Sequence, residues 1–248
     1  MPYLEPLGRV IAVDLPGTGE SDRIKRSTPA TYTIEFQRES LEAFANIVGL
    51  DEDVTLVLHG PASMVGFDWA SRHVSSVRAI VHMESITRPT VWPDFEDPFR
   101  TAFKRIRLGD VEKHVVNSKT YLAEALTREM IHPPTDEVLA EYAALFERGA
   151  DERRSYLASY QQIPVSGQPH NARNVVGAYS EWLEQTQIPK LLILGRPGYI
   201  LSGRMRSAAE RLPNQTVVEV IGRHLLPEDA PDGVGNLIAM WMRSLPST

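Results

Sequence analysis

Two ionisable side chains follow stretches that read as strands, and together they could form a base. Glu84 comes directly after the apolar run Val77–Met83, and His224 follows the run Thr216–Val220. A histidine within reach of a carboxylate is a common arrangement for general-base chemistry. A lone histidine is more often structural, however, and a glutamate at the end of a strand is usually only solvated, so the pair needs further support.

Other kinds of reactive site have little support in this sequence. The chain has 248 residues and no cysteine, which excludes thiolate metal sites, cysteine nucleophiles and disulfides. No pair of His, Asp or Glu has the spacing of metal ligands. The segment Gly17-Thr18-Gly19 lacks the third glycine and the following helix of a dinucleotide-binding loop, so it is interpreted as a turn. We therefore expect neither a metal nor a cofactor.

Charge and hydropathy favour a chain that works in solution. The formal net charge is −6 and no cluster of Lys and Arg stands out, which argues against nucleic acid and anionic membranes as partners. The longest apolar runs are too short to span a bilayer. The first residues have neither the basic region nor the apolar core of a signal peptide, so a cytoplasmic location is expected. The oligomeric state is left open.

Strands and helices alternate in the first and last parts of the chain. A helix of about four turns is expected after Thr33, which is a suitable N-cap, and before Gly49, which lies where a C-terminal capping glycine belongs. This alternation predicts a mostly parallel sheet with helices on both faces. The expected strands are Arg9–Leu15, Val54–Leu58, Val77–Met83, Lys190–Leu194 and Thr216–Val220.

The segment between the two halves of this sheet has a different pattern. From about Ile86 to Gln187 it shows no clear strand, and it contains helical stretches such as Thr135–Arg148 and Asn174–Gln185. An insert of this kind is typical of a cap. The sequence therefore predicts a core formed by residues 1–86 and 188–248, with a helical cap over residues 87–187.

Several motifs occur in a fixed order along the chain. They are LHGPASMVGFDWASRH at 58–73, DLPGTGESD at 14–22, HME at 82–84, IPVSGQP at 163–169 and RHLLPED at 223–229. In these motifs the chain resembles the haloalkane dehalogenase family of the α/β-hydrolase fold. The resemblance covers nearly the whole chain. It implies a mostly parallel sheet flanked by helices, with a helical cap inserted after the strand that ends near Glu84.

The resemblance also implies a reaction. Dehalogenases of this family attack the carbon–halogen bond with an aspartate, and a water activated by a histidine then cleaves the resulting ester. A third residue orients the histidine, while a tryptophan and an asparagine hold the departing halide. His224 matches the position of the base, and Glu84 matches the position of the orienting acid.

The nucleophile of the family is absent from this sequence. Gly60 stands where the family has aspartate, and Pro61 replaces the halide-binding tryptophan. Proline has no backbone N–H, so the usual oxyanion donor after the nucleophile is absent too. Asp68 lies about two helical turns further on, roughly 12 Å along the axis, and cannot substitute. Ser63 is the nearest hydroxyl, but at this position of the family it normally packs or caps.

The beginning of the chain is the second departure from the family. Residues 1–10 resemble the end of a helix that runs into a strand, and the first strands of the family are missing. One of those strands normally lies between the segments that correspond to Arg9–Leu15 and Val54–Leu58. Either the natural start lies upstream, or the sheet closes without that strand. Direct pairing of the two segments is expected, because each buried unpaired backbone group costs about 1–3 kcal/mol.

Two functions fit these observations. The first is a dehalogenase homologue that has lost dehalogenase chemistry and binds a small apolar molecule between core and cap. The aromatic residues that could line its pocket, or simply form core, are Trp92, Phe95, Phe99 and Phe103. The alternative is a hydrolase without a covalent step, in which His224 and Glu84 activate a water against an ester or lactone. A purely structural role is neither supported nor denied.

Overall fold

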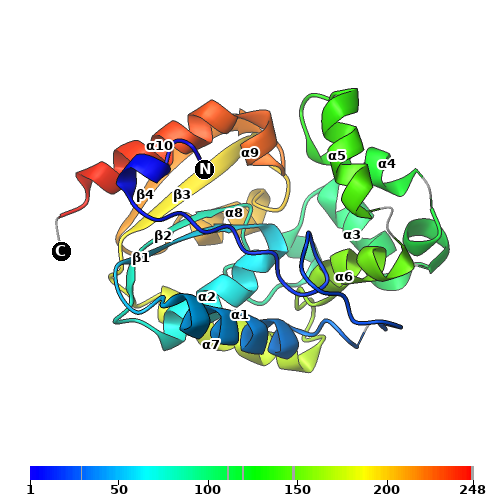
Figure 1. Ribbon diagram of the computed structural model, residues 1–248, viewed down its shortest axis with the longest axis horizontal. Helices are drawn as coiled ribbons and strands as arrows, with labels where there is room; N and C mark the ends of the chain where they lie inside the picture. The colour runs from blue at the N-terminus through cyan, green and yellow to red at the C-terminus, as the bar shows by residue number, and fades with distance from the viewer. Residues whose placement is uncertain (29, 111, 119, 147–148, 247–248) are drawn as a thin grey trace.

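The computed structural model describes residues 1–28, 30–110, 112–118, 120–146 and 149–246. Within these residues, one sheet of four parallel strands forms the centre of the molecule, in the order β1-β2-β3-β4 (Figure 1). The strands are β1 (Val54–His59), β2 (Val77–Met83), β3 (Lys190–Pro197) and β4 (Gln215–Gly222). Four of the five expected strands are therefore confirmed, as is the parallel arrangement.

Helices cover both faces of the sheet. On one face lie α1 (Ile34–Val48), α2 (Ser63–Arg72) and α7 (His170–Leu183), and on the other lies α10 (Pro231–Ser244) (Figure 1). Side chains alternate along β2, so that Ile80 packs into the first layer while Val81 and Met83 pack into the second. Burial on both faces explains why these strands read as continuous apolar runs.

The ends of α1 are set by local sequence. Thr33 has an extended backbone, and its hydroxyl accepts a hydrogen bond from the N–H of Phe36 at 3.3 Å. Gly49 takes a φ of +67° at the other end, in the left-handed region that glycine enters without a Cβ clash. Both caps were expected from the sequence, and both are confirmed.

A separate group of helices lies beyond one end of the sheet (Figure 1). The segment expected as a cap also contains α7, but this helix packs against α1 and α2 on the sheet rather than with the group. The last two residues of the expected helix Thr135–Arg148 lie outside the described residues. The group consists of α3 (Phe99–Leu108), a π-helical turn (Glu112–Val116), α4 (Tyr121–Glu129), α5 (Asp136–Phe146) and α6 (Ala150–Gln161).

The first segment of the chain differs from expectation. Residues 9–15 are extended but form no strand, and no backbone hydrogen bond joins them to β1 among the described residues. Ile11 and Val13 are exposed, and so is Val57 in β1, which is left as an edge strand. The expected direct pairing is wrong. A segment becomes a strand only where it exchanges backbone hydrogen bonds with a neighbour, and none joins residues 9–15 to β1 among the described residues.

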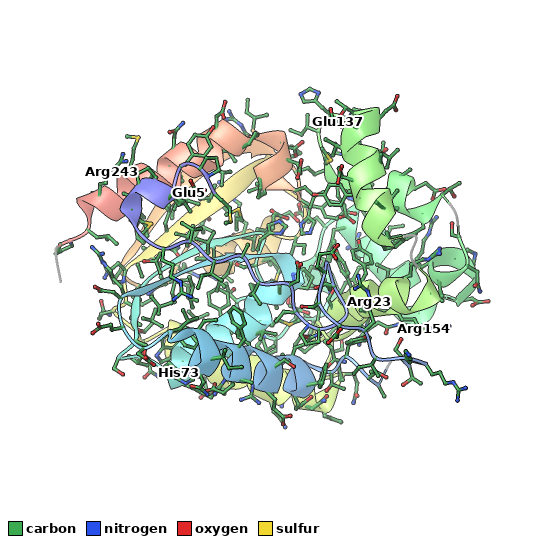
Figure 2. All side chains as sticks on the ribbon, viewed as in Figure 1. Glu5, Arg23, His73, Glu137, Arg154 and Arg243 are labelled. Carbon is green, nitrogen blue, oxygen red and sulfur yellow. The ribbon has the colours of Figure 1, made fainter. Side chains whose placement is uncertain are left out.

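The loop that follows this segment crosses to the helical group. The hydroxyl of Ser155 in α6 donates a hydrogen bond to the carbonyl of Gly17. Figure 2 shows Arg23, from the same loop, close to α6. The N-terminal part of the chain is therefore anchored at its far end, although its first stretch is not paired with the sheet.

A short backbone bridge joins the helical group to the segment after β4, around α9 (Leu226–Asp229). The N–H groups of His224 and Leu225 both donate to the carbonyl of Glu129, at 2.8 and 3.2 Å. The side chain of Asp229 accepts from the N–H of Ile131 at 2.8 Å and from that of Arg223 at the same distance. None of the described helices is long and apolar enough to cross a membrane.

Candidate active site

The turn between β1 and α2 places a glycine at a sharp elbow. Gly60 follows the last residue of β1 and takes a φ of +56°, a left-handed conformation that favours glycine. Pro61 is at the start of the short 3-10 turn Gly60–Ala62, where its missing N–H costs least. The strand–turn–helix geometry is that of a nucleophile elbow, but Gly60 has no side chain that could attack a substrate.

Glu84 lies just after β2 and is fully buried. Its backbone has a φ of +49°, a strained conformation for a residue other than glycine. The carboxylate accepts hydrogen bonds from the N–H groups of Tyr199 at 3.3 Å and Ile200 at 2.5 Å. Burial raises the pKa of Glu84 to about 7, and these N–H groups act in the opposite direction. The carboxyl group therefore titrates near neutral pH.

His224 faces this carboxyl group from the segment after β4. Its Nδ1 lies 3.4 Å from Oε2 of Glu84, and the histidine is only 2% exposed. Burial lowers the pKa of His224 below its usual value, so the imidazole is neutral at pH 7. With Nδ1 directed at the carboxyl group, Nε2 is the nitrogen left to act as a base.

Gly60 and His224 are neighbours across the site. A Cβ built on Gly60 would lie 3.4 Å from Cε1 and 3.5 Å from Nε2 of His224, which is the range of ordinary contact. The structure thus brings the three positions Gly60, Glu84 and His224 together at the carboxyl ends of the strands. A side chain at position 60 would have pointed at the basic nitrogen.

The two other groups weighed near the elbow have structural partners. The hydroxyl of Ser63 donates to the carbonyl of Gly60 at 2.6 Å and accepts from the N–H of Ile86 at 3.0 Å. The carboxylate of Asp68 pairs with Arg38 at 2.7 Å and with Arg72 at 3.0 Å. Ser63 therefore fixes the elbow, and Asp68 ties α2 to α1.

The four aromatic residues considered for a pocket pack against one another. Phe95, Phe99 and Phe103 are at most 2% exposed, and their ring centroids lie 5.0 to 5.5 Å apart. Trp92 packs on Phe103 at 5.5 Å. Tyr199 connects this cluster to the site, because its ring lies 5.2 Å from Phe99 and 5.7 Å from His224.

Three residues at the site were not anticipated from the sequence. His59 donates from Nε2 to the carbonyl of His224 at 2.8 Å, and the two rings lie 4.7 Å apart. Burial lowers the pKa of His59 to about 4. Glu129 is buried nearby on α4, and the hydroxyl of Tyr160 lies 3.5 Å from Nε2 of His224. Only His59, directly before Gly60 in the motif, carried a signal that could have identified it.

Among the described residues, neither a metal-binding cluster nor either of two cavities lies at this site. The described residues contain no cluster of three His, Asp or Glu side chains that could hold a metal ion. Two cavities, of about 280 and 490 Å³, are lined by other residues. The first lies beside α9 and the second between α7 and α8 (Gly203–Ala209). The described side chains Glu84 and His224 thus form a buried acid–base pair.

Known proteins match this chain along almost all of its length. The model of the alpha/beta hydrolase fold family matches residues 1–231. A haloalkane dehalogenase of Sphingobium indicum is 36% identical over 245 residues, which are 99% of this chain and 83% of that protein. A haloalkane dehalogenase of Mycolicibacterium smegmatis is 34% identical over 99% of this chain and 79% of its own length. The crystal structure of the haloalkane dehalogenase DbeA from Bradyrhizobium elkani superimposes with a TM-score of 0.88 at 28% identity, covering 98% of this chain and 83% of that one.

Proposed function

The chain belongs to the haloalkane dehalogenase family of the α/β-hydrolase fold, and we propose that it does not cleave carbon–halogen bonds by the covalent route. The observation that carries this proposal is Gly60 at the elbow, beside Nε2 of His224. Without a carboxylate at this position no ester intermediate can form. Pro61 supports the proposal, because it supplies neither an indole N–H for a halide nor a backbone N–H for an oxyanion.

The acid–base pair that remains is suited to holding a proton rather than to attacking carbon. Nδ1 of His224 faces Glu84, and burial keeps the imidazole neutral with its second nitrogen as an acceptor. In a covalent dehalogenase such a base acts only after the ester has formed. Here it has no ester to act on.

A small apolar ligand between core and cap is part of the same proposal. It is supported by ring contacts: the aromatic cluster of Phe95, Phe99 and Phe103 adjoins the site through Tyr199. Because these rings already contact one another, a ligand would have to separate them. An apolar molecule of a few carbons fits this requirement better than a large one.

Halide release tests the central claim. The purified protein is incubated with short bromoalkanes, and bromide is measured over hours beside the His224→Ala variant. We expect both proteins to match the buffer blank, because loss of a covalent nucleophile removes several kcal/mol of transition-state stabilisation. Bromide release by the wild type that disappears in His224→Ala would overturn the proposal.

A second candidate function is hydrolysis by a water that His224 activates. It is favoured by the space beside Gly60, where a Cβ would meet only ordinary contacts with the imidazole. Nε2 would take a proton from the water as its oxygen attacks a carbonyl carbon, and the leaving alkoxide or aryl oxide would take that proton back. A base of this kind contributes about 10²–10⁴-fold, enough for an activated ester or lactone but not for an alkyl chloride.

Aryl esters distinguish this candidate from the first. Hydrolysis of 4-nitrophenyl acetate and longer esters is followed for the wild type, His224→Ala and Glu84→Gln. The second function requires a rate that falls in both variants, because Glu84 holds the imidazole in place. Equal rates in all three proteins would show that the wild type does not hydrolyse esters by this route.

A further inference from the structure

The basic nitrogen of His224 is already in contact with another side chain. The hydroxyl oxygen of Tyr160 lies 3.5 Å from Nε2, and both residues are buried, at 4% and 2% exposure. Tyr160 belongs to the last turn of α6, a helix that also contacts the turn Gly60–Ala62. A residue of the helical group therefore reaches the same nitrogen that a side chain at position 60 would face.

The chemistry of the two groups fixes the direction of this contact. A phenol is a donor at any pH where it stays protonated, and burial raises the pKa of Tyr160 well above its usual value. The neutral imidazole, with Nδ1 facing Glu84, presents its lone pair at Nε2. Tyr160 is thus the donor and His224 the acceptor. The ionised alternative, a phenolate beside an imidazolium, is disfavoured because burial opposes both charges.

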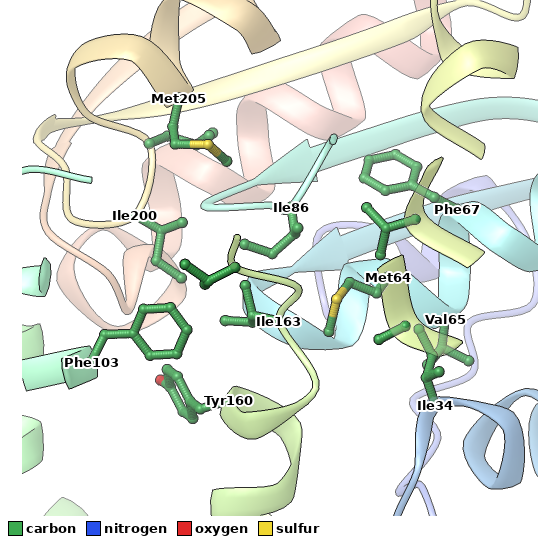
Figure 3. Packing of buried hydrophobic residues seen from close by; sticks show 14 of the residues in the cluster. Ile34, Met64, Val65, Phe67, Ile86, Phe103, Tyr160, Ile163, Ile200 and Met205 are labelled. Carbon is green, nitrogen blue, oxygen red and sulfur yellow. The ribbon is translucent and has the colours of Figure 1, made fainter. Parts of the chain in front are cut away.

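Packing holds the phenol ring in this position. Tyr160 packs against Tyr156, one turn earlier in α6, with the two rings tilted and their centroids 5.3 Å apart. Figure 3 shows Tyr160 beside Phe103, in the same part of the buried cluster as Ile163. Movement of the ring away from His224 therefore requires the end of α6 to shift or neighbouring side chains to repack.

We propose that Tyr160 gates the basic nitrogen of this site: its hydroxyl lies against Nε2 of His224 in the structure, and a water beside Gly60 or a ligand can donate to that nitrogen only when the phenol swings away. This inference rests on the proposed function, because it assumes that the acid–base pair is the chemistry that remains. It adds that His224 and Glu84 cannot activate a water while the hydroxyl of Tyr160 contacts Nε2. The absence of a nucleophile and the closed gate are separate causes of inactivity.

Two variants test the gate through the reactivity of His224. Tyr160→Ala removes the ring and the hydroxyl, and Tyr160→Phe removes only the hydroxyl. Tyr32→Phe is the matched control, since it removes the hydroxyl of another buried tyrosine, whose oxygen accepts from the N–H of Ile24 and does not contact His224. Each protein is treated with iodoacetamide, and alkylation of the peptide that contains His224 is followed by mass spectrometry. We expect at least about tenfold faster alkylation in Tyr160→Ala and no change in Tyr32→Phe.

Ester hydrolysis gives the functional readout. In Tyr160→Ala we expect a rate on 4-nitrophenyl acetate at least about tenfold above the wild type and no more than the 10²–10⁴-fold that a general base can contribute. The gain should vanish in the double variant with His224→Ala. If folded Tyr160→Ala shows neither faster alkylation nor a gain that depends on His224, the gate is wrong.

The smaller substitution keeps the proposal testable if Tyr160→Ala does not fold. In Tyr160→Phe the ring still fills the space, so the expected effect is at Nε2 itself. Loss of the O–H donor should move the ¹⁵N resonance of Nε2 in the neutral imidazole, and an unchanged resonance would refute the contact. Bromide release by the wild type would instead overturn the proposed function, so the two failures are distinguishable.

Discussion

Restoring a carboxylate at the elbow measures the strain that Gly60 relieves. Gly60 has a φ of +56°, and a residue with a Cβ in this region costs about 1–2 kcal/mol. The Cβ itself would meet only His224, at 3.4 and 3.5 Å, so steric overlap adds little. Gly60→Ala should therefore lose about 1–2 kcal/mol at any pH, since it introduces strain without charge.

Gly60→Asp should show the same strain and a further cost that depends on pH. At pH 9 Glu84, with its pKa of about 7, is ionised and His224 is neutral, so the new carboxylate is a buried charge beside a like charge. The total loss should reach about 3–5 kcal/mol. At pH 6 most of Glu84 is protonated and His224 can take up a proton to pair with the new carboxylate. The loss should then fall towards that of Gly60→Ala.

Urea denaturation at the two pH values is the assay. With a slope of about 2 kcal/mol per molar urea, the midpoint of Gly60→Asp should fall by roughly 0.5–1 M at pH 6 and by about 2 M at pH 9. Bromide release should stay at the blank, because Pro61 still supplies no donor for a halide. Equal midpoints for Gly60→Asp and wild type at pH 9 would mean that the elbow is not strained and that position 60 does not face the base.

Three further predictions concern the acid, the aromatic cluster and the sheet edge. Folding raises the pKa of Glu84 from 4.5 to about 7, so its contribution to stability is present below pH 4.5 and is lost as the pH rises through 7. Between pH 5 and pH 8, urea denaturation should therefore show the wild type losing up to about 3 kcal/mol of unfolding free energy relative to Glu84→Gln. Phe103→Ala, at a site with 0% exposure, should cost about 3–5 kcal/mol by the same method, and a cost below 1 kcal/mol would indicate a pocket wall rather than core. Val57→Lys on the edge strand β1 should keep the free energy of unfolding within about 0.5 kcal/mol of the wild type and should reduce self-association measured by light scattering. Unchanged scattering would show that this strand edge does not mediate self-association.

The parts of the fold that could be predicted were those determined by local sequence. The caps at Thr33 and Gly49 follow from residues that lie within one turn of the helix ends. Glu84 and His224 could be paired because the motifs around them resemble those that carry the acid and the base of the family, at the ends of two predicted strands. Residues 9–15 were predicted as a strand from the same kind of apolar run, but a strand also needs a partner, and no local pattern reports whether one is present.

The contact of Tyr160 with His224 could not be predicted for a related reason. The two residues are 64 positions apart, and their approach depends on how α6 is placed over the elbow. Tyrosines one turn apart on a helix are a common core pattern and give no indication of a catalytic neighbour. The same holds for Glu129, whose backbone carbonyl accepts from the N–H of His224 and whose buried side chain lies near the imidazole.

The hydrogen bonds from His224 and Leu225 to the carbonyl of Glu129 have a consequence for local unfolding. Because these N–H groups are held by α4 and not by the sheet, they can exchange with solvent only when the end of α4 detaches. The amide protons of His224, Leu225 and Ile131 should then exchange with deuterium at one common rate, faster than those of β2 and β3. His224 would thus belong to the same cooperative unit as α4. Partial opening of α4 would then disassemble the site before the sheet is disturbed.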